Sequence, residues 1–306
     1  MVRPHDFGFN EQTGSDNAFQ HRPESVAEGQ SIRKSAMLEF EKMVNILRKA
    51  GVEVLILDKP VTSTLLPDAV FPNNWFSTTA DGRLFLYPMK TLNRQAEVQQ
   101  VELQALLEEN HYELKDVIDL RTIWLADGQP MKALEGTGSL IFHHPTGTIF
   151  AAMSERCNKV ELEYFADKYN YQVFSFVSNS QAGLPIYHTN VLMSCGENFA
   201  VITEQILVDD SASAIAMERL RASVDDIITI TEQQMADSFC GNILQLCDNN
   251  NQPIIVMSES AFNGFTTVQL AVLEQHGSLI ICPIPTIEYI GGGSTRCMIA
   301  ENFLAK

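Results

Sequence analysis

The chain has 306 residues, of which 45% are hydrophobic and 19% charged, with a formal net charge of −17 and a pI near 4.7. This composition is that of a globular protein with enough apolar material for a large core, and we expect one domain over residues 1–306. The acidic balance argues against nucleic-acid binding and against an anionic membrane surface, because both are bound by clustered Lys and Arg.

Six cysteines stand at positions 157, 195, 240, 247, 282 and 297, and no CxxC pair occurs. Metal-ligand spacing is missing from the sequence, so we expect neither a zinc site nor any other metal or organic cofactor. The N-terminal MVRPHDFGFN has no apolar segment typical of a signal peptide, and the longest apolar stretches have only the length of strands. These features predict reduced thiols and a cytoplasmic protein.

The predicted elements begin with a helix, a strand and a hairpin in that order. Residues 32–49 have apolar positions three and four apart, which predicts an amphipathic helix that ends at Gly51. Residues 52–57 (VEVLIL) predict a buried strand. Residues 68–89 predict a hairpin, because Asp81-Gly82 is a turn dipeptide between two apolar runs.

The same order recurs along the rest of the chain. We expect helices at 94–108, 155–168, 211–221 and 265–276, strands at 112–120, 171–177, 226–231 and 278–284, hairpins at 135–154, 187–203 and 240–258, and a closing segment at 291–304.

Comparable strand positions are separated by 69, 51, 52 and 54 residues; they are Val70, Ser139, Asn190, Asn242 and Arg296. Five such units predict a closed α/β ring, which also removes exposed sheet edges. The fifth unit has no return strand of its own, and residues 7–10 (FGFN) are the candidate for it. An open α/β sheet is the alternative.

Unusual polar residues fall at one place in every unit, the start of the first hairpin strand. In a ring, equivalent positions point toward the same axis, so residues distant in the sequence are expected to converge in a central cleft. The motifs are PNNW (72–75), EGTGS (135–139), YHTN (187–190), CGN (240–242) and GGGSTRC (291–297).

Three of these residues predict cysteine-based catalysis. Cys297 follows three glycines, which permit close backbone approach to a ligand. A buried, inert thiol is the alternative, and it is our interpretation of the other five cysteines. His188 is the candidate acid and base, and Glu135 is the carboxylate that orients the imidazole. Glu155 is a rival acid, but it follows its hairpin and is expected to open the next helix.

The motifs GGGSTRCM, YHTNV, LEGTGSL and FPNNWFS and the opening RPHDFGFNEQ resemble those of the guanidino-group-modifying superfamily, over essentially the whole chain. Its members include arginine deiminases, dimethylarginine dimethylaminohydrolases and amidinotransferases, and the chain is most similar to arginine-deiminase-related citrulline-utilisation hydrolases (the CtlX-like group). The resemblance implies the five-bladed α/β propeller, or pentein, and a small-molecule substrate derived from citrulline or arginine. It also implies that Cys297 is the nucleophile, His188 the general acid and base and Glu135 its partner.

The sequence departs from this pattern at two positions. Arginine deiminases bind the cationic guanidinium with two aspartates, whereas the matching residues are Asn74 and Asn190. A neutral amide suits a ureido group, which offers a carbonyl oxygen as well as N–H donors. This favours conversion of citrulline to ornithine. Alternatively, Asp68 or Asp81 restores the missing charge.

Asn73 and Asn242 stand in the same motifs and complete the expected substrate contacts. Arg296 is a candidate for the amino-acid end of the substrate, whereas Arg94 is expected in a structural role. Residues 10–13 with Asn17 and Gln20 are further candidates for that end, Gly14-Ser15 for a lid hinge, and the N–H groups of Gly292 and Gly293 for an oxyanion site. An arginine or methylarginine hydrolase, an amidinotransferase and a non-enzymatic propeller remain alternatives, and the sequence leaves homo-oligomers open.

Overall fold

Four small sheets with the same strand order form the frame of the molecule, which a computed structural model describes over residues 1–24, 26–58 and 62–306. In each sheet the first strand is antiparallel to the second, and the second is parallel to the third. The sheets comprise β1 (Phe76–Thr78), β2 (Arg83–Leu86) and β3 (Asp116–Asp119); β4 (Ile141–His143), β5 (Thr148–Ala152) and β6 (Gln172–Phe176); β7 (Met193–Cys195), β8 (Phe199–Ile202) and β9 (Asp226–Thr229); and β10 (Leu244–Cys247), β11 (Pro253–Ser258) and β12 (Ser278–Cys282).

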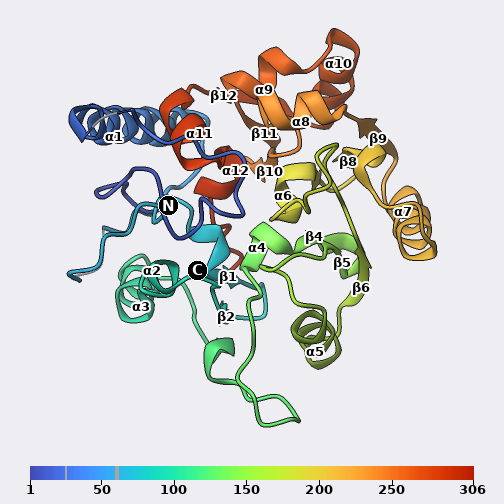
Figure 1. Ribbon diagram of the computed structural model, residues 1–306, viewed down its shortest axis with the longest axis horizontal. Coiled ribbons are helices and arrows are strands. Elements are labelled where there is room, and N and C mark those ends of the chain that lie inside the picture. The colour runs from blue at the N-terminus through green and yellow to red at the C-terminus, as the bar shows by residue number, and fades with distance from the viewer. Residues whose placement is uncertain (25, 59–61) are drawn as a thin grey trace.

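Longer helices lie on the outside of the molecule and very short helices near its middle (Figure 1). The outer helices are α1 (Val26–Lys49), α3 (Gln100–Glu109), α5 (Lys159–Tyr169), α7 (Ser211–Ser223) and α10 (Thr267–His276). The short central ones are α4 (Gly136–Ser139), α6 (Thr189–Leu192) and α12 (Thr295–Met298). The remaining elements are α2 (Leu92–Gln95), α8 (Glu232–Ser238), α9 (Glu259–Gly264) and α11 (Pro285–Gly291), with single 3₁₀ turns η1 (Pro72–Asn74), η2 (Leu120–Thr122), η3 (His144–Thr146) and η4 (Glu204–Ile206).

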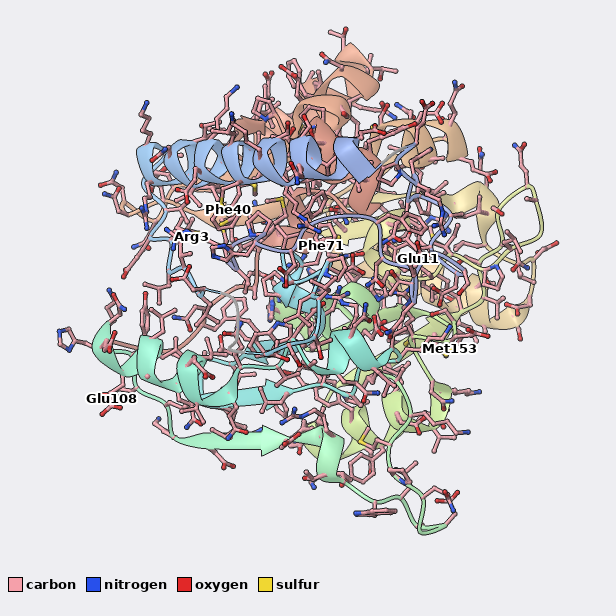
Figure 2. The ribbon with its side chains drawn as sticks, turned by 60° about the vertical axis from the view of Figure 1, so that its left-hand side comes forward. Arg3, Glu11, Phe40, Phe71, Glu108 and Met153 are labelled. Atoms are coloured by element: carbon pink, nitrogen blue, oxygen red, sulfur yellow. The ribbon has the colours of Figure 1, made fainter. Side chains whose placement is uncertain are left out.

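The outer helices form because one face of each is apolar. In α1 the buried positions recur every three or four residues, as at Ala36, Phe40, Met43 and Leu47. Figure 2 shows Phe40 on the side of α1 that faces the rest of the molecule. None of the described helices combines the length and apolar character needed to cross a bilayer.

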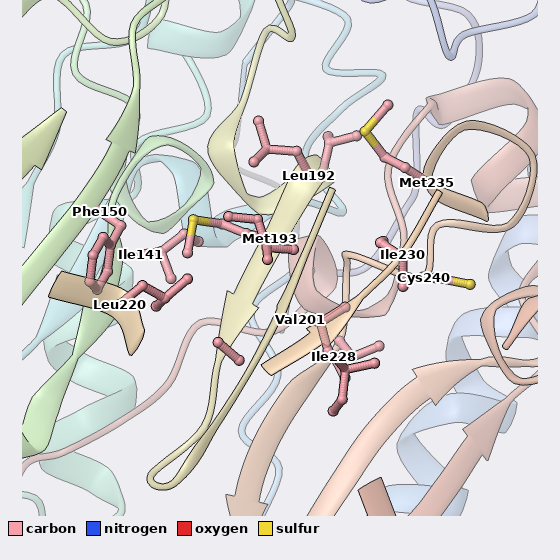
Figure 3. Close-up of a cluster of buried hydrophobic side chains, with 14 of the residues drawn as sticks. Ile141, Phe150, Leu192, Met193, Val201, Leu220, Ile228, Ile230, Met235 and Cys240 are labelled. Carbon is pink, nitrogen blue, oxygen red and sulfur yellow. The ribbon is translucent and has the colours of Figure 1, made fainter. Parts of the chain in front are cut away.

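The buried side chains form several cores rather than one. The largest fills the space around the β7–β8–β9 sheet, where Val201 lies beside Ile228, and Leu220 lies beside Ile141 and Phe150 (Figure 3). Another cluster joins α1 to the fourth sheet and to Phe71, and a third joins Val2, Trp75 and Leu304. The two chain ends and α1 therefore pack between the fourth sheet and the first.

Four of the five predicted hairpin units are confirmed, but the fifth is not a regular sheet among the described residues. The strand predicted at 52–57 is wrong: Leu57 makes a single parallel bridge with Val2. The return strand predicted at residues 7–10 is also wrong, because Phe7 packs in the core beside Phe71. Residues 1–3 lie beside Leu57 instead, and the His5 N–H turns back to the carbonyl of Arg3. The helices α8, α9 and α11 were not predicted.

The central turns come close enough that glycine is required between them. Gly136 has φ +42°, and a Cβ there would lie 2.5 Å from the carbonyl oxygen of Asn73 and 2.9 Å from that of Asn74. Thr137 Oγ1 also donates a 3.2 Å hydrogen bond to the carbonyl of Asn73. The EGTGS motif and the PNNW motif are therefore held together by their backbones.

We expect Gly136→Ala to lower the free energy of unfolding by about 1–3 kcal/mol beyond the cost of Gly128→Ala. Both glycines have positive φ, but an added Cβ at Gly128 meets no atom within 4 Å. The comparison separates backbone strain from the clash with Asn73. Urea unfolding measures both variants, and equal losses would contradict the close contact.

Candidate functional site

The thiol of Cys297 lies at the centre of a cluster of amides. Its side chain is on α12 and only 2% exposed. The Nδ2 groups of Asn190 and Asn242 each donate a 3.3 Å hydrogen bond to Sγ. Burial raises the pKa of the Cys297 thiol above its ordinary value, although the two amides oppose the shift. Burial therefore favours the protonated form of this thiol.

His188 and Glu135, predicted as a pair, are joined by a 2.7 Å hydrogen bond between Nε2 and Oε2. Both side chains are buried, the imidazole in front of α6 and the carboxylate in front of α4. Burial alone would raise the pKa of Glu135, but the charge of Arg156 and the bond from His188 outweigh it and lower this pKa to about 2. The ionised carboxylate accepts the Nε2–H, so Nδ1 is the nitrogen left to exchange a proton.

Burial lowers the pKa of His188 despite the opposing effect of Glu135. Burial thus favours a neutral imidazole and a neutral thiol over an ion pair of the two. His188 is the residue before α6 and Asn190 lies in α6, so this segment carries both the imidazole and an amide that contacts the thiol of Cys297.

Arg156 is the cation of the site and was not predicted. Its Nη1 lies 3.6 Å from Glu135 Oε2, its Nη2 lies 2.5 Å from Asp16 Oδ1, and its guanidinium stands over the ring of Tyr187 at 4.9 Å. Tyr187 OH donates a 2.6 Å bond to the carbonyl of Gly292, in the glycine run before Cys297. Tyr187 could have been found from the sequence, because it precedes His188 in the YHTN motif. Arg156 follows a strand, and no pattern in the sequence around it indicates a role in the site.

Several buried amide atoms of the site have no hydrogen-bond partner among the described residues. They are both side-chain polar atoms of Asn73 and the Oδ1 atoms of Asn74 and Asn190. A Cβ at Gly138 would lie 2.2 Å from Asn74 Oδ1 and 3.0 Å from His188 Nδ1, so this glycine leaves room for both groups. Buried polar atoms without partners are costly, and a ligand with N–H donors would satisfy the three oxygens.

Residues 16–20 of the N-terminal segment form a cover over the glycine run 291–293. Asn17 Nδ2 donates to the carbonyls of Gly291 and Gly292, and Gln20 Nε2 donates to that of Gly291. Gly292 has φ +61°, and a Cβ there would lie 2.8 Å from the backbone of Gln20. Asp16 fastens the segment, since its carboxylate contacts both Arg156 and Lys90. Asn17 and Gln20 thus contact the protein chain itself.

A cavity of about 1300 Å³ adjoins this cover. Arg156 and Tyr187 line it together with Asp16 and Phe19 of the N-terminal segment. Cys297 is not among its lining residues, so the cover separates the cavity from the thiol.

Several predictions are corrected by the structure. The guanidinium of Arg296 donates to Glu301 and to the carbonyl of Ile299 and lines a different cavity. The Gly292 N–H donates to Glu288, at the end of α11, and is not free for an oxyanion. Of the other five cysteines, Cys247 is exposed rather than buried.

The structure also locates the acidic residues considered as alternatives, which are Asp81, Glu155 and Asp68. Asp81 is half-exposed and pairs with Arg83, and Glu155 pairs with Lys90 at the surface. Asp68 is buried and accepts bonds from Asn10, at 2.7 Å, and from Thr13. Burial raises the pKa of Asp68. Arg94 forms a buried pair with Glu97, as expected of a structural residue.

Among the described residues, no group of three or more His, Cys, Asp and Glu side chains is placed to hold a metal. All six cysteines are free.

Solved structures with similar folds include the N-terminal domain of ArgZ, described as an arginine dihydrolase from the ornithine-ammonia cycle in Cyanobacteria. Its complex with substrate has a TM-score of 0.67 and 16% identity, covering 97% of this chain and 95% of that one. An ArgZ variant covalently bound to a reaction intermediate gives 0.68 and 17%, covering 98% and 95%. This chain covers 39% of full-length ArgZ.

A dimethylarginine dimethylaminohydrolase adduct with S-methyl-L-thiocitrulline has a TM-score of 0.60 and 12% identity, covering 87% of this chain and 88% of that one. No curated protein sequence is significantly similar. A family model described as N,N dimethylarginine dimethylhydrolase, eukaryotic, matches residues 3–304. The predictions of an enzyme acting on non-peptide C–N bonds and of the guanidino-group-modifying superfamily are thereby confirmed. The chain belongs to the N,N-dimethylarginine dimethylhydrolase family of that superfamily.

Proposed function

We propose that the protein hydrolyses a terminal C–N bond of a ureido or guanidino amino acid through a covalent adduct on Cys297. The observation that carries this proposal is the joint placement of three groups from distant segments. The Glu135–His188 hydrogen bond, the thiol and the unpaired amide oxygens gather around α4, α6 and α12. Such a nucleophile, an oriented imidazole and a set of polar ligand contacts are what covalent hydrolysis requires.

The reaction begins with a neutral thiol. His188 Nδ1 takes the proton of Cys297 when the substrate enters, and the thiolate attacks the ureido or guanidino carbon. His188 then gives that proton to the departing nitrogen, so an amine such as ornithine leaves while a carbon–sulfur bond remains. Water activated by His188 next breaks the carbon–sulfur bond. For citrulline the released carbamate decomposes to carbon dioxide and ammonia.

Glu135 keeps the imidazole in the required orientation and stabilises its cationic form. The amide N–H groups of Asn190 and Asn242 already point at Sγ, and we assign them to the oxygen that becomes negative during attack. The unpaired oxygens of Asn73 and Asn74 accept the N–H groups of the substrate. Arg156 is a buried cation beside Glu135, and we assign it the α-carboxylate of the substrate, a role first expected of Arg296.

The neutral amides at Asn74 and Asn190 support citrulline as the first candidate substrate, because no carboxylate stands at either position. The names of the relatives support arginine and methylarginine as the second and third candidates. Asp68 does not restore a charge beside the thiol of Cys297, since its carboxylate is bonded to Asn10 and Thr13.

We also propose that the chain closes into a five-unit ring. Support comes from α1 and both chain ends, which pack between the fourth sheet and the first. Met1 donates its amino group to the carbonyl of Leu55, and Lys306 pairs with Glu53. These contacts occupy the place of a fifth unit.

Replacing Asn74 by Asp tests the substrate class. We expect the variant to lose turnover of citrulline relative to arginine by roughly 10- to 100-fold, since a charge-assisted contact contributes about 1.5–3 kcal/mol. Ornithine, citrulline and ammonia are assayed with each substrate separately. Asn250→Asp, in the exposed turn before β11, is the matched control. Citrulline formed from arginine by the unmodified protein, with citrulline itself untouched, would exclude the ureido substrate.

The raised pKa of Cys297 predicts its reactivity. At pH 7 iodoacetamide should label the exposed Cys247 before Cys297, because the buried thiol is protonated. Labelling of Cys297 should accelerate as the pH rises through 9 and beyond. Mass spectrometry of peptides follows both sites. Rapid labelling of Cys297 at pH 7 without substrate would mean that it rests as a thiolate and would contradict this assignment.

We expect the ion pairs of Asp16 to limit the access of reagents to Cys297. Asp16→Asn should speed the labelling of Cys297 at fixed pH about 5- to 30-fold, the equivalent of 1–2 kcal/mol, by weakening the contacts to Arg156 and Lys90. Glu11→Gln breaks the exposed pair with Arg22 on the same segment and serves as the control. Equal labelling of the two variants would show that Asp16 does not hold the cover.

A further inference from the structure

A second cavity, of about 440 Å³, lies where β4, β7 and β10 meet the C-terminal segment 296–303. It shares no lining residue with the cavity beside Arg156. Its volume is several times that of a water molecule and suits a small organic ligand. Nothing in the proposed reaction uses it.

One wall of this cavity holds an ion pair with spare hydrogen-bonding capacity, in which Arg296 is buried and Glu301 is half-buried. Arg296 is 6% exposed, and its Nη2 lies 3.0 Å from Glu301 Oε2 while Nη1 donates to the carbonyl of Ile299. A guanidinium has five N–H donors and a carboxylate has two oxygens, so these contacts leave donors on Arg296 and an acceptor on Glu301.

An unpaired hydroxyl stands at the same wall. Ser194 lines the cavity and is 5% exposed, and its Oγ has no hydrogen-bond partner among the described residues. A buried polar group without a partner costs about 1–3 kcal/mol, which a polar ligand atom would recover.

The other walls combine apolar and polar residues. Ile141, Phe142, Ile243 and Phe303 line the cavity, and so do His144, Glu197 and Gln245. The segment that carries Glu301 and Phe303 is fastened to β1, because Thr78 Oγ1 donates to the carbonyl of Glu301 and accepts the N–H of Phe303 at 2.9 Å. The site is therefore formed before a ligand arrives.

We propose that this cavity binds a zwitterionic α-amino acid with an apolar side chain. The ligand carboxylate pairs with Arg296 and Ser194, the ammonium with Glu301, and the side chain packs on Phe142 and Ile243. A ligand with both charges presents its carboxylate to Arg296 and its ammonium to the carboxylates of Glu301 and Glu197, whereas a singly charged ligand leaves one sign of charge in the cavity without a counter-charge.

The second cavity lies close to Cys297 but does not include it. The Arg296 N–H donates a 3.1 Å bond to Asn242 Oδ1, and the Nδ2 of Asn242 donates to the thiol of Cys297. One amide thus separates the second cavity from the thiol.

Calorimetric titration of the whole protein with three probes tests the charge requirement. L-phenylalanine should bind with one-to-one stoichiometry at least tenfold more tightly than 3-phenylpropionate, which lacks the ammonium, or phenethylamine, which lacks the carboxylate. Failure of L-phenylalanine to bind, or equal affinity for a singly charged probe, overturns the proposal.

Two variants locate the binding. Glu301→Gln should weaken L-phenylalanine at least tenfold and strengthen 3-phenylpropionate, a reversal that unfolding cannot produce. Ser194→Leu should fill the cavity and abolish binding of all three probes, with circular dichroism confirming the fold. Glu204→Gln, which breaks an exposed pair with Arg221, is the control and should leave every affinity unchanged. Loss of binding in the control, or unchanged affinities in Glu301→Gln, overturns the proposal.

Saturating L-citrulline separates this site from the proposed catalytic one. It should not displace L-phenylalanine, and displacement would place the probe beside Arg156 and overturn the proposal. If the protein does not turn over citrulline or arginine, the affinities of the Glu301→Gln variant still decide whether the second site exists.

Discussion

The site depends on the contacts that the buried carboxylate of Glu135 makes with its neighbours. This carboxylate is surrounded by His188 at 2.7 Å and Arg156 at 3.6 Å, and its Oε1 accepts the backbone N–H of Lys90 at 2.9 Å. A lone carboxylate in such a place would be protonated, whereas these partners keep it ionised. The charge then fixes the tautomer of His188 and the position of Arg156. Through Arg156 and Asp16 the same network reaches the N-terminal cover.

The residues around the thiol are neutral, in contrast to this charged network. Cys297 contacts the amides of Asn190 and Asn242, and the unpaired oxygens nearby belong to Asn73, Asn74 and Asn190. The site thus has an anionic side at Glu135 and an uncharged side around the thiol of Cys297.

The sequence predicted the hairpins and the contact of Glu135 with His188 because both depend on local patterns. Alternating apolar residues and turn dipeptides located β4–β5 and β10–β11, and equal spacing placed Glu135 beside His188. The strand at 52–57 failed because its pairing depends on the chain end, where the His5 N–H turns back to the carbonyl of Arg3. Arg156 was missed, and the ion pair of Arg296 was not foreseen, because the direction of a long side chain is decided by tertiary partners, Asp16 and Glu301 respectively.

The burial of the Cys297 thiol has a consequence for its oxidation. Oxidants such as peroxide react with thiolates that solvent can reach, whereas Cys297 is 2% exposed and burial raises the pKa of its thiol. Cys247 at the surface is the first thiol that a small oxidant meets. The burial that disfavours the thiolate of Cys297 therefore also protects this side chain from irreversible oxidation.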